Sequence, residues 1–432
     1  MKLVAAALLA ASLHTPAGQD VSLKTTDVTF TTTDGQRLGG EIFRPARATG
    51  DLPGLLLVHG SGAGNSWREL RAEAEAFARQ GMVVLAPDKR ATGYSKTHRD
   101  YSQLADDALA ALAVLRRQPG VGPTGVWGLS EGGWVAPIAA VRSKDVKFLV
   151  TVGGPGLAPL RTQSWNAMNK LDRAGVRGSL RRAYAGSLHR LAADAGLFPE
   201  AYYDPAVTLG RLTQPVLAMW GAADNQVMPA ESAQRFRANV HSSLTVKFFP
   251  GAPHALHVNE STLTPGYAEA VGSWVTGVAA GDVPPSSAQP YPAQESRSID
   301  TPPSAWWESW QLMVGAMALM LLAFLAYAVR RLGAGSWAAR ILAVSGALSI
   351  VAMAYTLVSL LMTSNGLGVT TGPMLLGRPV TWLAAQLFAA VATVAALTCL
   401  TRWRTASLRV RMVAVAGTLF IPWALYWGLL IP

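Results

Sequence analysis

Short apolar runs and helical repeats alternate along the first 280 residues of the chain. Six runs of six or seven residues are apolar at nearly every position, as in strands that are covered on both faces. Between them lie stretches such as residues 67–80 and 101–118, in which apolar side chains recur at helical spacing. This alternation predicts an α/β fold, a doubly wound and mostly parallel sheet covered by helices. The six runs are residues 52–58, 82–87, 124–129, 146–152, 215–220 and 244–249.

Two stretches depart from this alternation. Residues 27–45 alternate polar and apolar side chains on either side of Asp34-Gly35, which predicts a β-hairpin. Residues 156–214 contain helical stretches and no convincing strand. An insertion at this point in the succession of strands and helices would lie over the carboxyl ends of the strands, where open α/β sheets bind ligands. We therefore expect a helical lid at about residues 156–214, inside a domain of residues 26–280.

The chain changes character after residue 280. Residues 281–305 are rich in proline and serine, which predicts an extended linker. Beyond it lie four apolar segments, each near the length of about 20 residues that spans a bilayer. We expect residues 306–432 to form an all-α transmembrane domain with four spans, at about residues 311–329, 341–362, 380–400 and 412–430.

The surroundings of these segments favour an anchor over a transporter. Trp306, Trp307 and Trp310 precede the first segment, where an interfacial aromatic belt is expected. The segments contain no acidic residue and no histidine, which argues against a proton-coupled transporter.

The first residues have the pattern of an export signal. Lys2 is followed by an apolar stretch too short to span a bilayer and by small residues near Ala17. We predict a signal peptide over residues 1–17; the alternative is a short buried helix. Cys399 is the only cysteine, so no intramolecular disulfide is possible and cysteine usage does not test export.

The net charge of +11 is explained by the membrane region rather than by a nucleic-acid partner. Much of the positive charge lies in short arginine clusters between apolar segments, and neither zinc-finger spacing nor a basic recognition helix is present. We expect no nucleic acid among the partners.

The basic residues are unevenly divided among the loops. The loop between spans two and three has one basic residue, Arg378, whereas the flanking loops contain Arg330, Arg331, Arg340, Arg402, Arg404, Arg409 and Arg411.

This arrangement predicts an orientation. Positively charged short loops stay in the cytoplasm, so the first and third loops lie inside and the middle loop lies outside. The domain of residues 26–280 and the C-terminal Pro432 would then face the periplasm or cell exterior, in agreement with the signal peptide.

Candidate chemistry begins with "GVWGLSEGGW", residues 125–134, which contains the pattern Gly-x-Ser-x-Gly. Ser130 follows a predicted strand and precedes a predicted helix, and Gly128 and Gly132 remove bulk from the tight turn between them. Such a turn lifts the serine hydroxyl above the sheet edge, beside the N–H groups of the helix N-terminus. We predict that Ser130 is a nucleophile; the alternative is a small residue packed in a close helix–strand contact.

A serine nucleophile needs a base and a partner for that base. His254 lies in "FFPGAPHALHV", on a loop after the last strand and before the last helix, and we predict that it is the base. His257, three residues further on, is the competitor. Asp224 follows Gly221 on the preceding strand–loop junction, and we predict that it orients His254; the alternative is a solvated turn aspartate.

A tetrahedral oxyanion needs preformed donors. We assign one donor to the backbone N–H of Glu131, the residue after the predicted nucleophile. The second is assigned to the backbone N–H of Ser61, in the glycine-rich loop "HGSG" after the strand "LLLV". We expect His59 to orient that loop and the Glu131 side chain to be a surface carboxylate.

Five motifs together resemble the α/β-hydrolase superfamily: "LLLVHGSGAG", "DKRATGYS", "GLSEGG", "GAADNQV" and "PGAPHA". The resemblance covers residues 26–280 and is greatest to the branch of serine esterases and aminopeptidases with a helical lid. The order Ser130, Asp224, His254 is the chain order of catalytic triads in this superfamily. One position departs from the pattern: Ala91 follows Arg90, where similar members often have a glycine, and this affects the expected pocket shape rather than the chemistry.

These residues predict a membrane-anchored serine hydrolase that cleaves ester, thioester or related acyl bonds through an acyl-enzyme on Ser130. It requires no metal and no organic cofactor, and its expected partners are a small acyl substrate and membrane lipid. The alternatives are a serine aminopeptidase or peptidase of the same fold, and a non-catalytic hydrolase-like binding module. An aminopeptidase would need a lid carboxylate for the substrate amine, and the lid offers Asp172, Asp194, Glu200 and Asp204.

The lid also has more basic than acidic side chains. We interpret these charges as a solvated helix face; the alternative is that they meet anionic head groups or an acidic substrate. They are Arg161, Lys170, Arg173, Arg177, Arg181, Arg182, Arg190 and Arg211.

Overall fold

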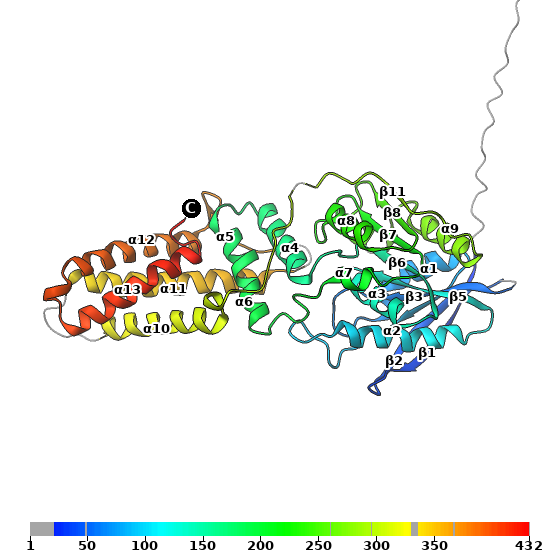
Figure 1. Ribbon diagram of the computed structural model, residues 1–432, viewed down its shortest axis with the longest axis horizontal. Helices are drawn as coiled ribbons and strands as arrows, with labels where there is room; N and C mark the ends of the chain where they lie inside the picture. Colours follow the sequence, from blue (N-terminus) through cyan, green and yellow to red (C-terminus); the bar gives the residue numbers. More distant parts are fainter. Residues whose placement is uncertain are drawn as a thin grey trace, which may run out of the picture.

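The computed structural model contains a β-sheet covered by helices and, beside it, a bundle of four long helices (Figure 1). Residues 21–47, 50–259, 261–294, 296–329, 336–365 and 368–431 are described. The predicted signal peptide and the loop arginines Arg330 and Arg331 lie outside these ranges.

A nine-stranded sheet forms the centre of the first part, in the order β1-β2-β4-β3-β5-β6-β7-β8-β11. Across the sheet, every neighbouring pair from β4 to β11 in this order is parallel. The strands β1 and β2 form an antiparallel hairpin, and β2 also pairs antiparallel with β4. The predicted hairpin at Asp34-Gly35 is present. The strands are β1 Leu23–Thr31, β2 Arg37–Pro45, β3 Leu52–Val58, β4 Val83–Pro87, β5 Val121–Leu129, β6 Val146–Val152, β7 Val216–Gly221, β8 Leu244–Phe249 and β11 Ser287–Ala288.

Helices cover both faces of this sheet, which explains why its central strands are apolar throughout. One face packs against α2, α3 and α8, and the other against α1 and α9. The doubly wound α/β fold predicted from the apolar runs is therefore confirmed. The helices of this part are η1 Trp67–Leu70, α1 Arg71–Arg79, α2 Tyr101–Arg116, α3 Gly132–Arg142, α7 Pro205–Leu209, α8 Pro229–Asn239 and α9 Tyr267–Ala279.

Between β6 and β7 the chain forms the helices of the predicted lid, and these lie between the sheet and the four-helix bundle (Figure 1). Their apolar side chains, including Leu171, Leu180 and Tyr184, share one continuous core with the bundle. The lid helices are α4 Pro159–Arg173, α5 Ser179–Arg182, a short π-helix η2 Ala183–Leu188 and α6 His189–Asp194.

Hydrogen bonds reinforce this packing at several places. The Tyr184 hydroxyl donates to the carbonyl of Leu360, with an oxygen–oxygen distance of 3.3 Å. The backbone N–H of Arg177 donates to the carbonyl of Gly377 at 2.7 Å. The lid is thus fixed to the end of the bundle that faces the sheet.

The four long helices after the linker are apolar enough and long enough to cross a membrane. The small β12 Met374–Leu375 and β13 Arg378–Pro379 hairpin lies between the second and third helices. The helices are α10 Trp310–Val329, α11 Trp337–Thr363, α12 Val380–Thr401 and α13 Leu408–Tyr426, with short 3-10 turns η3 Trp306–Glu308 and η4 Trp403–Thr405. No aspartate or glutamate follows Glu308 in the sequence.

The segment predicted to be a linker is extended but is held along the sheet and lid. Its residues Ser287–Ala288 form β11, the edge strand next to β8. Further along, the Ser298 backbone N–H donates to the Glu231 carboxylate of α8 at 2.9 Å. Arg161 of α4 donates to the Ser298 hydroxyl at 2.7 Å, so the segment also contacts the lid.

Candidate active site

Ser130 lies in a sharp turn between β5 and α3, with a backbone φ of 54°. This left-handed conformation is rare for residues other than glycine and is stored strain of the kind found at functional sites. The neighbouring glycines are needed for close approach: a Cβ on Gly128 would lie 2.1 Å from the carbonyl oxygen of Gly132. A Cβ on Gly132 would lie 2.6 Å from the carbonyl oxygen of Val58. The turn therefore has the geometry expected from the Gly-x-Ser-x-Gly pattern.

Asp224 and His254 meet on the loops after β7 and β8. The His254 Nδ1 lies 2.7 Å from the Asp224 Oδ2, and both side chains are buried. The other carboxylate oxygen of Asp224 accepts bonds from the backbone N–H groups of Gln226 and Val227, at 2.8 and 2.9 Å. These bonds fix the carboxylate, which as an acceptor holds the His254 proton on Nδ1. The structure thus brings together the predicted base and its predicted partner.

Ser130 and His254 both adjoin the end of strand β6. The Ser130 backbone N–H donates to the Val152 carbonyl at 2.9 Å. The next residue, Gly153, faces the imidazole so closely that a Cβ there would lie 2.8 Å from the His254 Cε1. Among the described residues, the buried Nε2 of His254 has no hydrogen-bond partner. This nitrogen is therefore not occupied by any described side chain or backbone group.

Two other histidines are engaged elsewhere. The His257 Nε2 lies 2.6 Å from the Glu73 carboxylate of α1, which directs it away from Asp224. The His59 Nε2 lies 2.7 Å from the Pro87 carbonyl, and burial lowers the pKa of His59. Neutral His59 therefore joins the ends of strands β3 and β4, which agrees with the orienting role expected for it.

The two predicted oxyanion donors belong to facing loops. A Cβ on Gly60, the residue before Ser61, would lie 3.4 Å from the Ser130 Cβ, so the loop after β3 runs beside the serine. Within the described part of the chain, neither the Ser61 nor the Glu131 backbone N–H donates to a protein acceptor. Both remain candidates for binding a ligand oxygen.

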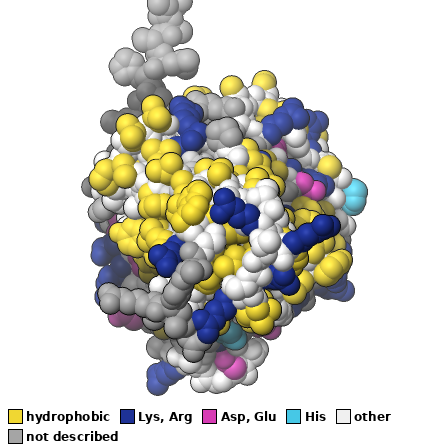
Figure 2. All heavy atoms as spheres, turned by 90° about the vertical axis from the view of Figure 1, so that its left-hand side faces the viewer, with side chains coloured by type: hydrophobic (Ala, Val, Ile, Leu, Met, Phe, Trp, Pro, Cys, Tyr) yellow, Lys and Arg dark blue, Asp and Glu magenta, His cyan; other side chains and the backbone are white. Residues whose placement is uncertain are grey.

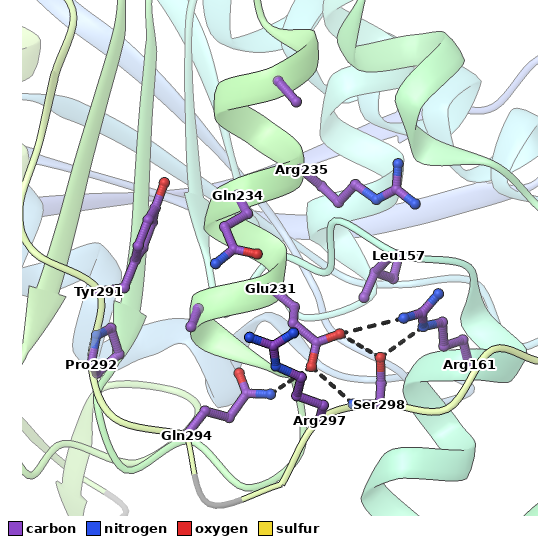
Figure 3. Close-up of a pocket in the computed structure, with 12 residues that line it drawn as sticks. Leu157, Arg161, Glu231, Gln234, Arg235, Tyr291, Pro292, Gln294, Arg297 and Ser298 are labelled. Carbon is purple, nitrogen blue, oxygen red and sulfur yellow. Dashed lines mark hydrogen bonds and ion pairs between the residues drawn. The ribbon is translucent and has the colours of Figure 1, made fainter.

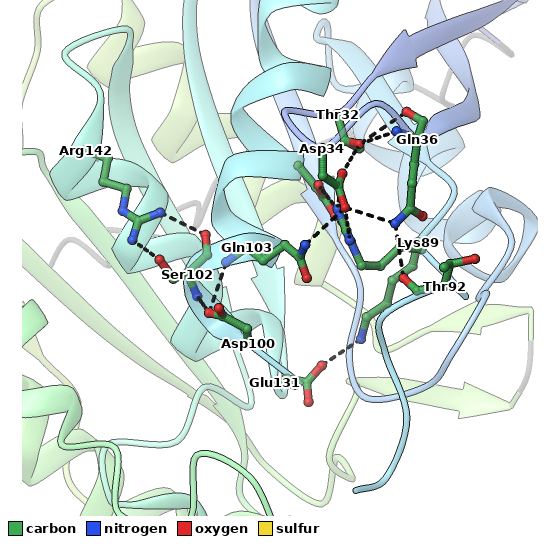
Figure 4. A network of polar contacts seen from close by, with 12 residues as sticks. Thr32, Asp34, Gln36, Lys89, Thr92, Asp100, Ser102, Gln103, Glu131 and Arg142 are labelled. Carbon is green, nitrogen blue, oxygen red and sulfur yellow. Dashed lines mark hydrogen bonds and ion pairs between the residues drawn. The ribbon is translucent and has the colours of Figure 1, made fainter. Parts of the chain in front are cut away.

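The expectation that the Glu131 side chain is a surface carboxylate is wrong. The residue is only 1% exposed, and its carboxylate accepts from Lys89 at 2.6 Å and from Arg99 at 2.9 Å. The Tyr94 hydroxyl donates to the same carboxylate at 2.8 Å (the Lys89 bond is shown in Figure 4). One signal for this burial is present in the sequence: two cations and a tyrosine follow β4 on loops at the same edge of the sheet as Ser130.

Arg90, the residue before the unusual Ala91, is buried in a second ionic cluster. Its guanidinium donates to Asp107 of α2 at 2.5 and 2.6 Å and to Asp34 of the hairpin at 2.9 and 3.0 Å. Hydrogen bonds from Arg90 and Thr32 hold the pKa of Asp34 well below its usual range. This cluster fixes the loop that contains Lys89 to the hairpin and to α2 (Figure 4).

Several charged side chains of the lid make contacts within the protein. Each of the four lid acids accepts an internal hydrogen bond: Asp172 from Arg181, Asp194 from Tyr202, Glu200 from the Tyr101 N–H and Asp204 from the Ala206 N–H. Several cations are also paired, Arg161 with Glu231 and Asp300 and Arg190 with Glu308. Part of the lid charge is therefore balanced by contacts within the protein.

A pocket of about 700 Å³ lies away from Ser130, between the linker segment, α4 and α8 (Figure 3). It is lined by Arg161, Arg235 and Arg297 and by Glu231, which pairs with Arg161 and Ser298. It contains none of the predicted catalytic residues, so it is not the candidate active site.

Among the described residues, no cluster of histidine, cysteine, aspartate or glutamate could hold a metal ion.

Comparison with known proteins supports the fold. Residues 53–196 match the sequence profile of the α/β-hydrolase fold family. The thiohydrolase aneE of Aspergillus aculeatus is 34% identical over 134 residues, which cover 29% of this chain and 40% of that protein. Esterase EstD of Thermotoga maritima is 28% identical over 212 residues, which cover 44% of this chain and 50% of that protein. The chain thus spans half or less of the length of these relatives.

Among solved structures, an esterase of Pyrococcus furiosus is 18% identical in sequence, with a TM-score of 0.43. The alignment covers 61% of this chain and 93% of the esterase chain. The profile match and the strand order show that the first part of the chain has the α/β-hydrolase fold, with relatives among esterases and thiohydrolases. Four long apolar helices are attached to it at the C-terminal side.

Proposed function

We propose that the protein is a membrane-bound serine hydrolase that cleaves small acyl esters or thioesters through an acyl-enzyme on Ser130. The observation that carries this proposal is the buried contact of 2.7 Å between the Asp224 Oδ2 and the His254 Nδ1, beside a serine in a strained turn. A histidine held in this way presents Nε2 as a base, and a strained serine presents its hydroxyl.

The proposed reaction has two half-reactions. His254 Nε2 takes the Ser130 proton as the hydroxyl oxygen attacks the substrate carbonyl, and it then gives that proton to the leaving alcohol or thiol. A water molecule attacks the acyl-enzyme in the same way and releases the acid. In both steps, the Ser61 and Glu131 backbone N–H groups would stabilise the oxyanion.

The substrate class rests on the relatives and on the lid. EstD is named an esterase and aneE a thiohydrolase, which favours ester and thioester bonds. A serine aminopeptidase of the same fold is less well supported, because each of the four lid acids accepts an internal hydrogen bond. Hydrolysis of p-nitrophenyl acetate, a short acyl-CoA and an aminoacyl p-nitroanilide by the purified full chain would compare these classes.

The choice of base is tested with two histidine variants. His254→Ala should lower kcat on p-nitrophenyl acetate by about 10³-fold or more, because one group transfers the proton in both half-reactions. His257→Gln should keep near-native activity, because His257 is paired with Glu73. Loss of activity in His257→Gln with activity kept in His254→Ala would refute the assignment.

We also propose that the hydrolase part faces the periplasm or cell exterior. The starts of α11 and α13 and the connection between α12 and α13 lie at the bundle end far from the sheet (Figure 1), and five described arginines belong to these segments. Figure 2 shows basic side chains among apolar ones at this end, and positive loops favour the cytoplasm. Near the lid, the segment between α11 and α12 contains one basic residue, Arg378. The five arginines are Arg340, Arg402, Arg404, Arg409 and Arg411.

Reporter fusions test this orientation. Alkaline phosphatase fused after the C-terminal Pro432 should be active, because that end would lie outside, and a fusion at Ala334 should be inactive. The reverse pattern would contradict both the orientation and the export of the hydrolase part.

A further inference from the structure

The Glu131 carboxylate is joined by two separate routes to the loop that contains Ser61. In the first route, the Lys89 Nζ donates to the Glu131 Oε1 at 2.6 Å and to the Gly60 carbonyl at 2.7 Å. In the second, the Tyr94 hydroxyl donates to Glu131 at 2.8 Å and accepts from the Gly62 backbone N–H at 3.3 Å. The two routes therefore end on the residues immediately before and after Ser61.

We propose that Lys89 and Tyr94 are positioning residues that set the distance between the two oxyanion donors, the backbone N–H groups of Ser61 and Glu131. This inference rests on the proposed function, because it assigns a role only if those two N–H groups bind an oxyanion. Neither side chain is a catalytic residue, since both act through the Glu131 carboxylate.

Burial makes these contacts specific. The Lys89 side chain is 7% exposed and that of Glu131 is 1% exposed, so neither charge is stabilised by bulk water. Buried charges must be matched by partners at close range, and a shift of one partner leaves the other unsatisfied. The Lys89 Nζ also lies 4.0 Å from the centre of the Tyr94 ring, so the two routes support each other.

The segment that contains Lys89 is itself anchored to the Ser61 loop through the backbone. The Lys89 N–H donates to the Asn65 carbonyl at 2.9 Å, and the Gly64 N–H donates to the Arg90 carbonyl at 3.0 Å. Gly62 has a φ of 148°, and a Cβ there would lie 2.0 Å from the Asn65 Oδ1. The loop is therefore held in one conformation, and the two side-chain routes fix its separation from Glu131.

The effect on catalysis follows from the distance dependence of the oxyanion bonds. Donors stabilise the developing oxyanion when they lie about 2.7–3.1 Å from it, and loss of one donor lowers kcat by about 10²–10³-fold. Loosening one of the two donors should cost less than removing it. We expect a decrease in kcat of about 10- to 100-fold when one route is cut.

Tyr94→Phe in the full chain is the decisive variant, because it removes one hydroxyl and keeps the ring beside Lys89. With p-nitrophenyl acetate we expect kcat to fall at least tenfold while KM changes less than about threefold. Binding of a trifluoromethyl ketone, which forms an oxyanion on the serine, should weaken by the same factor as kcat/KM. Lys89→Met should have the same signature with a larger effect.

Tyr203→Phe is the matched control, because it removes a tyrosine hydroxyl that is bonded to Thr208 at 2.7 Å, away from Ser130. It should leave kcat and ketone affinity unchanged. If Tyr94→Phe behaves like this control while Ser130→Ala is inactive, the positioning role is wrong and the hydrolase assignment stands. If Tyr94→Phe loses activity without losing ketone affinity, the role is also wrong. If the native protein cleaves neither an ester nor a thioester and binds no ketone, the proposed function is wrong and this inference falls with it.

Discussion

The Ser179 hydroxyl donates a hydrogen bond of 2.6 Å to the carbonyl of Gly428, across 249 positions of the sequence. Ser179 begins the lid helix α5, and Gly428 follows the last apolar helix α13. The Gln386 side chain of α12 donates to the same two oxygen atoms at 3.3 Å. The lid is therefore built onto the bundle, so the four long helices support the lid.

Gly428→Ala should loosen this junction. Gly428 has a φ of 73°, and a Cβ would lie 2.6 Å from the Ser179 Cβ, so alanine brings both backbone strain and a clash. We expect trypsin to cleave the lid faster at Arg177, Arg181 and Arg182 in detergent-solubilised protein. Gly315→Ala is the control, because a Cβ at Gly315 meets nothing within 4 Å. Equal cleavage rates in the two variants would show that this contact does not hold the lid.

One lid residue also contacts the loop that contains Asp224. The Asn169 side chain of α4 donates to the carbonyl of Asn225, the residue after Asp224, at 3.2 Å. The Nζ of the neighbouring Lys170 donates to the hydroxyl of Ser364 at 3.5 Å, and Ser364 directly follows α11. A single helix thus joins the Asp224 loop to the bundle.

Gly153→Ala should disturb His254 directly. A Cβ at this position would lie 2.8 Å from the His254 Cε1 and 2.9 Å from its Nδ1, so the ring must shift away from Gly153, which disturbs its contact with Asp224. We expect kcat on p-nitrophenyl acetate to fall by about 10²-fold, in line with the loss caused by small misplacements of catalytic groups. Gly266→Ala is a matched control, because Gly266 also has a positive φ, 79°, but a Cβ there would meet no atom within 4 Å. Similar activity in the two variants would contradict the placement of His254.

Stability should fall in acid because of His59. Burial lowers the pKa of His59 below its ordinary value of 6.5, so the unfolded chain binds a proton near pH 6.5 that the folded chain does not. The free energy of unfolding should therefore decrease as the pH falls below about 6.5, by at most about 1.4 kcal/mol per pH unit for this group.

Urea unfolding of the native chain and His59→Gln between pH 7.5 and 5 measures this contribution as the difference in slope. Other titrating groups affect both proteins and cancel in the difference. Identical slopes would show that His59 takes up a proton equally well in the folded state.

The sequence predicts the sheet well because burial on both faces leaves a direct mark. A strand such as β6 must be apolar at nearly every position, and no distant partner is needed to recognise it. The lid is different: the apolar spacing of Leu180 and Tyr184 shows that a helix has a buried face but does not say what covers it. Their packing against the bundle is therefore visible only in three dimensions.

The candidate site divides in the same way. The turn around Ser130 and the loop positions of Asp224 and His254 follow from local pattern and chain order. The burial of Glu131 depends on Lys89, Tyr94 and Arg99, which are 32 to 42 positions away in the sequence. Such long-range pairing leaves no periodic signal.

Covalent labelling with a fluorophosphonate is the sharpest test of Ser130 as the nucleophile. The probe should add one phosphonyl group to the native full-length chain, and peptide mass spectrometry should locate it on Ser130. Ser130→Ala should remain unlabelled and lose ester hydrolysis by several orders of magnitude. Labelling at another residue, or near-native turnover by Ser130→Ala, would contradict the assignment of Ser130 and the proposed acyl-enzyme route.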